Sequence, residues 1–239
     1  MKSAEPPKLE PDPTPQGRIC FKAHSGGKCR YGLPFFGDTF NMFFNYVSDG
    51  ALAEFVGGND TLSGGDGADR LYGEAHGVSY HSASWQSGIG DEVLICGDDV
   101  LMGGAGADAL IGDVQTIILH NGYSTVLSGD DVLMDGTGND SLYGDSINTY
   151  GLAGYQTGAD TFVFEANSGA DTIYDFEVGK DHIDVSALGY TNFADVSALF
   201  TWDAGTGDLI IDWDGAGTYV DQVTLLGNTS LTADNFVFA

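Results

Sequence analysis

A nine-residue pattern rich in glycine and aspartate recurs between residues 57 and 164 of this 239-residue chain. It reads G-G-x-G-x-D-x-U-x, where U is a large apolar residue, and residues 64–72 and 103–111 match it in full. Residues 135–143 match it with Asp135 in place of the first glycine. Half-matches lie at residues 58–62, 97–101, 129–133, 158–162 and 169–173. Repetition of this kind predicts a solenoid in which consecutive coils stack on one another.

Each nonapeptide divides into a turn and a short strand. The glycines allow the positive φ angles of a tight turn and leave backbone carbonyls uncovered, while the aspartate adds a charged oxygen. The apolar residue of each strand is expected to point inward: Leu62, Leu71, Leu101, Leu110, Leu133, Leu142 and Phe162. Because two nonapeptides complete one coil, the full motifs should share one edge of the solenoid and the half-motifs the other. The first edge holds Asp69, Asp108 and Asp140, and the second holds Asp60, Asp99, Asp131 and Asp160.

The turns of the second edge are interrupted, so we call it the insert edge and the other the smooth edge. Each interrupted turn begins with a short pair and resumes only after an insert of residues 75–96, 114–128 or 146–157. The opening pairs are Gly73-Glu74, Gly112-Asp113 and Gly144-Asp145. We expect the inserts to be three adjacent loops on one edge. They either pack on each other as a lateral cap or form a binding face.

The charge of the chain is strongly negative and unevenly distributed. It carries 35 acidic and 8 basic residues, and after residue 30 only Arg70 and Lys180 are basic. This balance excludes a nucleic-acid-binding protein that works by neutralising phosphates, and no apolar run is long enough for a transmembrane helix. Carboxylates at such density repel one another unless something neutralises them, and divalent cations are the obvious candidate.

The repeats resemble those of the RTX (repeats-in-toxin, haemolysin-type calcium-binding) family of secreted bacterial proteins. The resemblance covers residues 57–164, and the following segment is similar to that of serralysin-type proteins. It implies an all-β fold, a right-handed parallel β-roll with loop insertions on one edge and a β-sandwich-like C-terminal cap. It also implies that several Ca²⁺ ions bind between stacked turns, since calcium needs six to eight oxygen ligands and one turn cannot supply them.

The family's coordination, carried over to this chain, names the expected calcium ligands. On the smooth edge Gly65, Gly67 and Asp69 would meet Gly103, Ala105 and Asp108, and Gly104, Gly106 and Asp108 would meet Asp135, Thr137 and Asp140. On the insert edge Gly58 and Asp60 would face Asp99, Gly97 and Asp99 would face Asp131, and Gly129 and Asp131 would face Asp160. Where the inserts separate the turns, Asp98, Asp113, Asp130 and Asp145 would serve as substitutes.

Four segments are expected along the chain. Residues 1–30 form a proline-rich, basic, flexible tail, and residues 31–56 form an aromatic N-terminal cap. Residues 57–164 form the calcium-binding β-roll, and residues 165–239 form a C-terminal β cap whose end resembles that of type I secretion substrates. Cys20 and Cys29 either form a disulfide or stay free, and residues 212–215 are either an extra calcium loop or a solvated turn.

The sequence thus predicts a secreted, calcium-binding protein whose roll folds on meeting extracellular calcium. We expect export by the type I route from a bacterial cell and a structural, adhesive or partner-binding role outside it or at its surface. Self-association, or another extracellular protein, would use the insert edge. The alternative is the C-terminal export and folding module of a larger secreted protease or lipase. No catalytic constellation stands out, so the chain itself is not expected to be an enzyme.

Overall fold

The computed structural model describes the repeat region and the C-terminal third almost continuously. Its described residues are 18–20, 35–36, 41–46, 53–56, 58–82, 92–119, 124–150, 152–215, 221–227 and 230–239. The predicted tail lies largely outside this set, as does the pairing of Cys20 with Cys29. Only short strands of the predicted aromatic cap are described.

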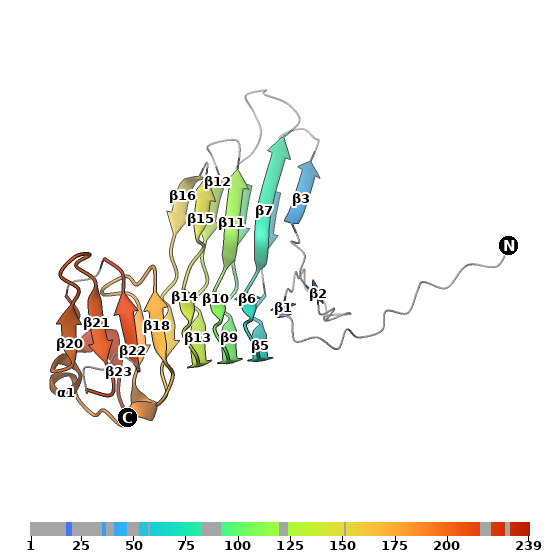
Figure 1. Cartoon of the computed structure of the whole chain (residues 1–239). Helices are drawn as coiled ribbons and strands as arrows, with labels where there is room; N and C mark the ends of the chain where they lie inside the picture. Colours follow the sequence, from blue (N-terminus) through green and yellow to red (C-terminus); the bar gives the residue numbers. More distant parts are fainter. Residues whose placement is uncertain are drawn as a thin grey trace, which may run out of the picture.

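Two sheets enclose the core of the described residues (Figure 1). The six-stranded sheet has the order β23-β19-β17-β13-β9-β5. The nine-stranded sheet has the order β2-β1-β6-β10-β14-β18-β22-β21-β20. The first contains β5 (Thr61–Asp66), β9 (Val100–Ala105), β13 (Val132–Thr137), β17 (Thr161–Val163), β19 (His182–Asp184) and β23 (Phe236–Val237). The second contains β1 (Arg18–Cys20), β2 (Phe35–Phe36), β6 (Arg70–Tyr72), β10 (Ala109–Ile111), β14 (Ser141–Tyr143), β18 (Ala170–Ile173), β20 (Phe200–Trp202), β21 (Leu209–Asp212) and β22 (Gln222–Leu225).

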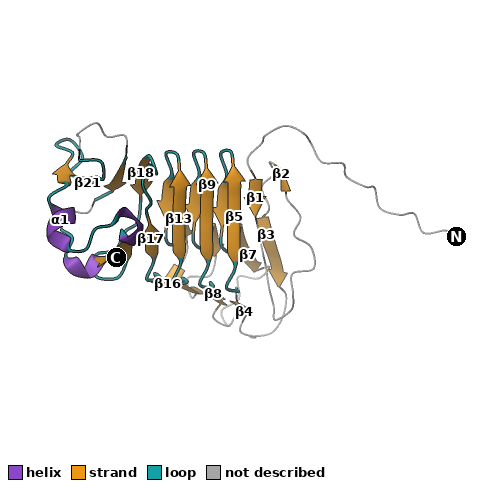
Figure 2. Cartoon of the chain, turned by 90° about the horizontal axis from the view of Figure 1, so that it is seen from below, coloured by secondary structure: helices purple, strands orange, loops and turns teal. Residues whose placement is uncertain are grey.

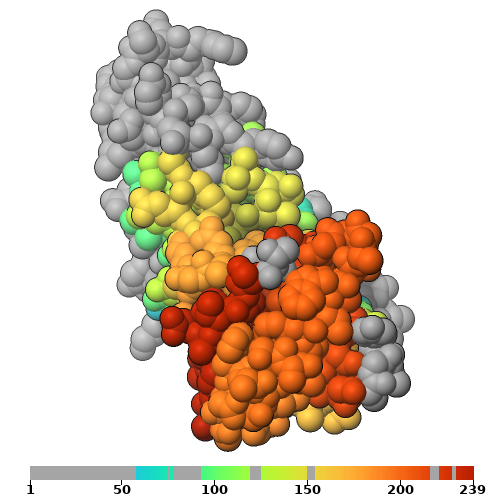
Figure 3. Space-filling view, turned by 90° about the vertical axis from the view of Figure 1, so that its left-hand side faces the viewer, coloured from blue at the N-terminus to red at the C-terminus, as the bar shows by residue number. Residues whose placement is uncertain are grey.

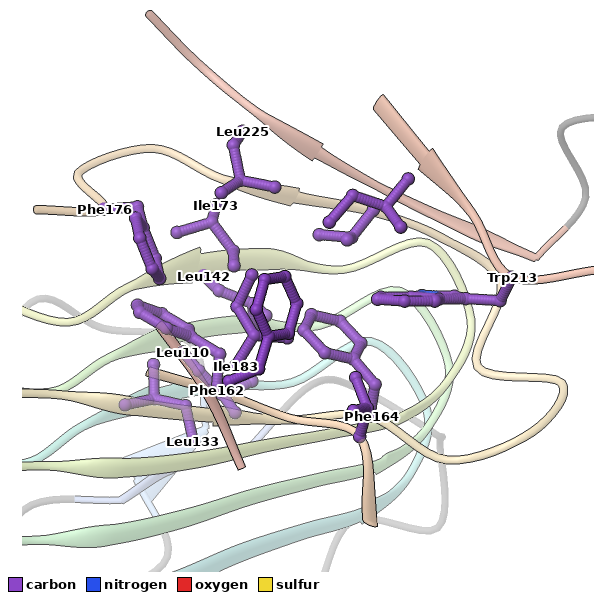
Figure 4. Close-up of a cluster of buried hydrophobic side chains, with 14 of the residues drawn as sticks. Leu110, Leu133, Leu142, Phe162, Phe164, Ile173, Phe176, Ile183, Trp213 and Leu225 are labelled. Atoms are coloured by element: carbon purple, nitrogen blue, oxygen red, sulfur yellow. The ribbon is translucent and has the colours of Figure 1, made fainter. Parts of the chain in front are cut away.

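The parallel pairing places equivalent repeat residues side by side. Leu62 pairs with Leu101, which pairs with Leu133, and Leu71 pairs with Leu110 in the same way. These apolar positions form a single buried column between the two sheets, which continues through Phe162, Ile173, Ile183 and Leu225 (Figure 4). The predicted all-β parallel β-roll is therefore confirmed, and the inward-pointing residues are the ones that the repeat indicates.

The inserts differ from the expected loops, because most of their described residues form strands. One parallel sheet has the order β15-β11-β7-β3 and contains β3 (Asn41–Tyr46), β7 (Ala75–Ser82), β11 (Val114–Leu119) and β15 (Asn148–Tyr150). A second parallel sheet has the order β16-β12-β8-β4 and contains β4 (Ala53–Val56), β8 (Glu92–Ile95), β12 (Ser124–Leu127) and β16 (Leu152–Gln156). Consecutive coils hold the inserts at strand spacing, so their backbones continue the ladder outward from the roll. Figure 1 shows the insert strands above β6, β10 and β14 of the roll.

The strands after residue 164 extend both sheets of the roll. β18 and β22 lie parallel to β14, and β19 and β23 lie parallel to β17. The end is completed by antiparallel β21 and β20, by α1 (Phe193–Ser197), and by two 3-10 turns, η1 (Ser186–Leu188) and η2 (Ala233–Asn235). This C-terminal segment covers the open end of the core, and Figure 3 looks onto that face. Its sheets are continuous with those of the roll.

Glycines on the smooth edge permit coils to approach more closely than any side chain would allow. Gly65, Gly104 and Gly136 have φ angles of 94°, 101° and 94°. A Cβ added to Gly136 would lie 2.0 Å from the carbonyl oxygen of Gly104, and one added to Gly104 would lie 2.3 Å from that of Gly65. A Cβ on Gly65 would meet no described atom within 4 Å. Stacking therefore requires glycine at Gly104 and Gly136 for space as well as for backbone conformation.

We expect Gly136→Ala to destabilise the protein by more than Gly65→Ala. Both substitutions impose a positive φ on alanine, which costs about 1–2 kcal/mol, but only Gly136→Ala also forces two coils apart. Urea unfolding of both variants in calcium-containing buffer measures the difference. Equal losses of unfolding free energy would contradict the close stacking of the coils.

Candidate metal sites along two aspartate ladders

The smooth edge carries a continuous ladder of aspartates. The backbone N–H of Asp69 donates to Oδ1 of Asp108 at 2.7 Å, and that of Asp108 donates to Oδ1 of Asp140 at 2.7 Å. The ladder extends one coil further than expected, because the N–H of Asp140 donates to Oδ1 of Asp171 at 2.9 Å. These aspartates come from the turns that follow β5, β9 and β13 and from β18. Figure 2 shows those turns in a row.

The insert edge carries a second ladder of the same construction. Asp60 N–H donates to Asp99 Oδ1 at 2.5 Å, and the pattern repeats from Asp99 to Asp131 and from Asp131 to Asp160 at 2.7 and 2.8 Å. It also extends further than expected, since Asp160 N–H donates to Asp181 Oδ1 at 3.0 Å. The two residues that sequence reasoning missed, Asp171 and Asp181, follow the same Gly-x-Asp signal.

The second oxygen of many ladder aspartates is buried and makes no hydrogen bond. This holds for Oδ2 of Asp108, Asp131, Asp140, Asp160 and Asp171. A buried polar atom without a partner is costly, and a buried charge costs more. A row of such oxygens facing one edge is the arrangement expected where cations complete the contacts.

Backbone carbonyls of the predicted glycines lie close to the neighbouring coil along the same edges. Ideal Cβ atoms built on the glycines of one coil would lie 1.5–2.6 Å from carbonyl oxygens of a neighbouring coil. Among the predicted ligands, those carbonyls belong to Gly58, Gly65, Gly67, Gly97, Gly103, Gly104, Gly106, Gly129 and Asp135. The carbonyls of Ala105 and Thr137 accept hydrogen bonds from Gly67 and Gly106, both at 2.7 Å. The donor set is made of carboxylate and carbonyl oxygens, which is the set that calcium prefers.

The third full motif departs from the repeat at its first residue, and this adds a third carboxylate to one position on the smooth edge. Asp135 stands where the repeat has glycine, and one oxygen each of Asp135, Asp140 and Asp171 lie within 4.8 Å of one another. All three residues are buried, and Asp135 Oδ1 accepts from Gly136 N–H at 2.8 Å while its Oδ2 has no hydrogen bond. The structure thus places the Asp135 side chain, and not only its carbonyl, beside the ladder.

The four substitute aspartates fall into two groups. Asp98 and Asp130 are exposed and bond along the surface, with Asp130 N–H donating to Asp98 Oδ1 at 3.0 Å. Asp113 and Asp145 are buried at the bases of the inserts, where they accept from the N–H groups of Gly129 and Gly158. Glu74, which the sequence did not mark as a ligand, does the same for Gly97 at 2.6 Å. Only the buried group lies beside the ladder of the insert edge.

Crowding of these acids perturbs their protonation in the absence of metal. Burial, reinforced by Asp145 and Asp181, raises the pKa of Asp160 to about 9. Burial, reinforced by the charge of Asp171, raises the pKa of Asp140 to about 7. Burial likewise raises the pKa values of Asp131 and Asp135. The metal-free roll therefore holds protons that the unfolded chain would have released at neutral pH.

This predicts that the metal-free protein is more stable in mild acid than at neutral pH. For Asp140 and Asp160 the pKa is higher in the folded state. Their stabilising effect is therefore complete below the unfolded value near 4 and is lost as pH rises through about 7 to 9. In chelator the strand signal of the circular dichroism spectrum should be greater at pH 5 than at pH 8, because each group lowers the unfolding free energy by up to about 1.4 kcal/mol for each pH unit. A metal-free protein that grows more stable over that range would contradict the buried ladders.

Comparison with known proteins identifies one family and several solved structures that are partly similar. Residues 56–237 match the family described as Peptidase M10 serralysin C terminal. The AlgE6R3 subunit of the Azotobacter vinelandii mannuronan C5-epimerase is 27% identical at a TM-score of 0.43, covering 74% of this chain and 81% of that one. The AlgE6R2 subunit of the same enzyme is 25% identical at 0.37, covering 80% and 94%. Extracellular lipase LipA from Serratia marcescens is 18% identical at 0.28, covering 81% and 41%.

A search of curated proteins finds no match. Among the described residues, no helix is both long and apolar enough to cross a membrane. The family match spans most of the chain and includes every aspartate of both ladders. The chain therefore belongs to the serralysin C-terminal family, with repeats of the RTX type stacked in a parallel β-roll.

Proposed function

We propose that this chain is a secreted module that binds several calcium ions and folds when it meets them. The single observation that carries the proposal is the pair of ladders in which buried Oδ2 atoms face carbonyls across stacked turns. Calcium accepts six to eight oxygens at about 2.3–2.6 Å, and two stacked turns offer a donor set of that kind. The ions would sit between coils on both edges, with Asp135, Asp140 and Asp171 contributing three carboxylates to one of them.

The energetics favour folding that is triggered by the ions. For a site of extracellular affinity, with a dissociation constant of about 10⁻⁴ M, a tenfold excess of calcium contributes roughly 1.4 kcal/mol. Several such sites would supply a large part of the ~5–15 kcal/mol that stabilises an ordinary domain. Without the ions, buried carboxylates must either bind protons or repel one another. The chain would then remain unfolded where calcium is scarce and fold where it is abundant.

Calcium should convert the chain from a disordered to a β-rich state. The far-ultraviolet circular dichroism of the chelated protein at neutral pH should lack strand signal, and calcium titration should restore it cooperatively. Magnesium is the control, because it demands a tighter octahedral site and keeps its water. Strand signal that persists unchanged in chelator would contradict the proposal.

A single ladder oxygen can be tested without disturbing the ladder bond. In Asp108→Asn the amide oxygen can still accept from Asp69 N–H, but the buried second oxygen is replaced by the NH₂ of the amide. Loss of an anionic ligand should weaken calcium binding at least roughly tenfold at the affected sites, which is about 1.4 kcal/mol each. Asp66→Asn removes the same charge from an exposed position and should bind as the parent does. Isothermal titration would contradict the assignment if the two variants behaved alike.

The family match favours one role for this chain, that of the export and folding module of a larger secreted enzyme. In that role it would contribute no catalysis, in keeping with the absence of a catalytic constellation from the sequence. A reporter enzyme fused ahead of the chain should appear in the medium only when type I secretion components are co-expressed. Retention of the fusion in the cell would contradict this role.

The other arrangement is a structural or adhesive surface protein that binds a partner, or itself, through the insert strands. The feature that supports it is the pair of parallel insert sheets, which project from the roll and are built from segments poor in charge. Size-exclusion chromatography with light scattering, with and without calcium, distinguishes self-association from a monomer. A calcium-dependent increase in mass would favour this role.

A further inference from the structure

The three inserts begin and end at equivalent bases, which stack on one another. At each base an acidic side chain accepts a hydrogen bond from the glycine at which the chain rejoins the roll. Glu74 Oε1 accepts from Gly97, and Asp113 Oδ1 and Asp145 Oδ1 accept from Gly129 and Gly158. The residue just before that glycine differs between the bases, and is Cys96, Ser128 and Thr157 in turn. Only the first base therefore carries a sulfur.

At the first base, a thiol lies between two carboxylates in a dry environment. One ligand atom each of Glu74, Cys96 and Asp113 lie within 4.8 Å of one another. The three residues are 2%, 5% and 0% exposed. Glu74 Oε2 is buried and makes no hydrogen bond, although Oε1 of the same carboxylate is fully used by Gly97. An unpartnered oxygen within a closed acidic cluster is where a cation would be stabilised most.

The third base already holds a positive charge. Lys180 Nζ donates to the carbonyl and the hydroxyl of Thr157, and it pairs with Glu177 at 3.4 Å. The stacked column of bases thus takes a cationic group at its C-terminal end from the protein itself. The first base instead brings together the side chains of Glu74, Cys96 and Asp113.

We propose that Glu74, Cys96 and Asp113 form a site for a thiophilic divalent cation of the Zn²⁺ class, which lies beside the calcium ladder of the insert edge. Calcium is a hard cation that favours oxygen ligands alone, whereas a thiolate with carboxylates suits Zn²⁺ and its analogue Cd²⁺. On binding, the thiol releases its proton to solvent and the sulfur becomes a ligand. The ladder aspartates Asp99 and Asp60 interact electrostatically with Glu74, so the proposed site is tested with the calcium sites filled.

The test uses Cd²⁺, because a cadmium–thiolate bond gives an ultraviolet charge-transfer band that oxygen ligands do not. The reference protein carries Cys20→Ser and Cys29→Ser, so that Cys96 is its only cysteine. Cd²⁺ is added before folding is started with excess calcium, which keeps the oxygen sites filled. We expect a band that saturates at one ion per chain and that is lost in Cys96→Ser, a change that copies the second base. Absence of the band from the reference protein would overturn the proposal.

Glu74→Gln tests whether cadmium is bound by the whole cluster or by the Cys96 thiol alone. The amide oxygen can still accept from Gly97 N–H, so the base stays closed, while the anionic second oxygen is removed. We expect cadmium binding at least tenfold weaker in this variant, with the calcium-induced circular dichroism change retained. Binding as tight as that of the reference would overturn the site. Calcium-triggered folding is recorded in the same samples, so failure of this site and failure of the proposed function are distinguishable.

Ser128→Cys in the reference protein extends the test to the second base. There Asp113 and Asp145 flank Ser128, and its hydroxyl interacts with both carboxyl groups. Adding a sulfur should raise the number of cadmium–thiolate ions from one to two per chain. An unchanged number would contradict the claim that the paired acids at an insert base create the site.

Discussion

The hydrogen bond from an aspartate N–H to Oδ1 of the equivalent aspartate one coil further on organises both edges of this roll. It fixes the carboxylate in orientation, so that Oδ1 is used within the protein while Oδ2 is left facing the gap between turns. Repeated through Asp171 on one edge and Asp181 on the other, it aligns negative charge at the spacing of β-strands. Such an alignment is unfavourable for a protein by itself, since burial already raises the pKa of Asp160 to about 9. In the proposed function, bound cations would resolve this conflict and link the stability of the protein to the ions around it.

The remaining architecture follows from keeping the coils close enough for that bond. Because residues Gly104 and Gly136 have no side chain, carbonyl oxygens of the neighbouring coil can lie in the volume that a side chain would occupy. The leucine column between the sheets supplies apolar burial along the whole stack, and the aromatic residues of the C-terminal segment close one end of it, with Phe200 and Phe236 in stacked contact. Consecutive coils also hold the inserts one strand spacing apart. Inserts of different length therefore form regular parallel sheets. Side chains such as Glu74 then close the point at which each insert leaves the roll.

Much of this could be predicted from the sequence, because the repeat encodes local structure and stacking together. Positions such as Leu110 and Leu142 were predicted to be core residues and have no exposed surface. The alignment of Asp108 with Asp140 followed from the rule that two nonapeptides make one coil. The inserts were predicted as loops, because their strand pairing depends on neighbouring coils rather than on any local pattern. Asp171 was missed as a ladder member because the segment after residue 164 was taken as a separate cap, whereas its strands continue the sheets. The role of Glu74 depends on a contact across 23 residues, which spacing alone does not reveal.

The central claim is that ions lie between coils along both ladders. It is tested most directly by a crystal structure grown in saturating calcium, with the ions located from their anomalous scattering. The account predicts two columns of peaks, one beside Asp108, Asp140 and Asp171 and the other beside Asp99, Asp131 and Asp160, each peak within bonding distance of carboxylate and carbonyl oxygens. A well-ordered roll with the same aspartate hydrogen bonds and no anomalous peak along either edge would contradict it.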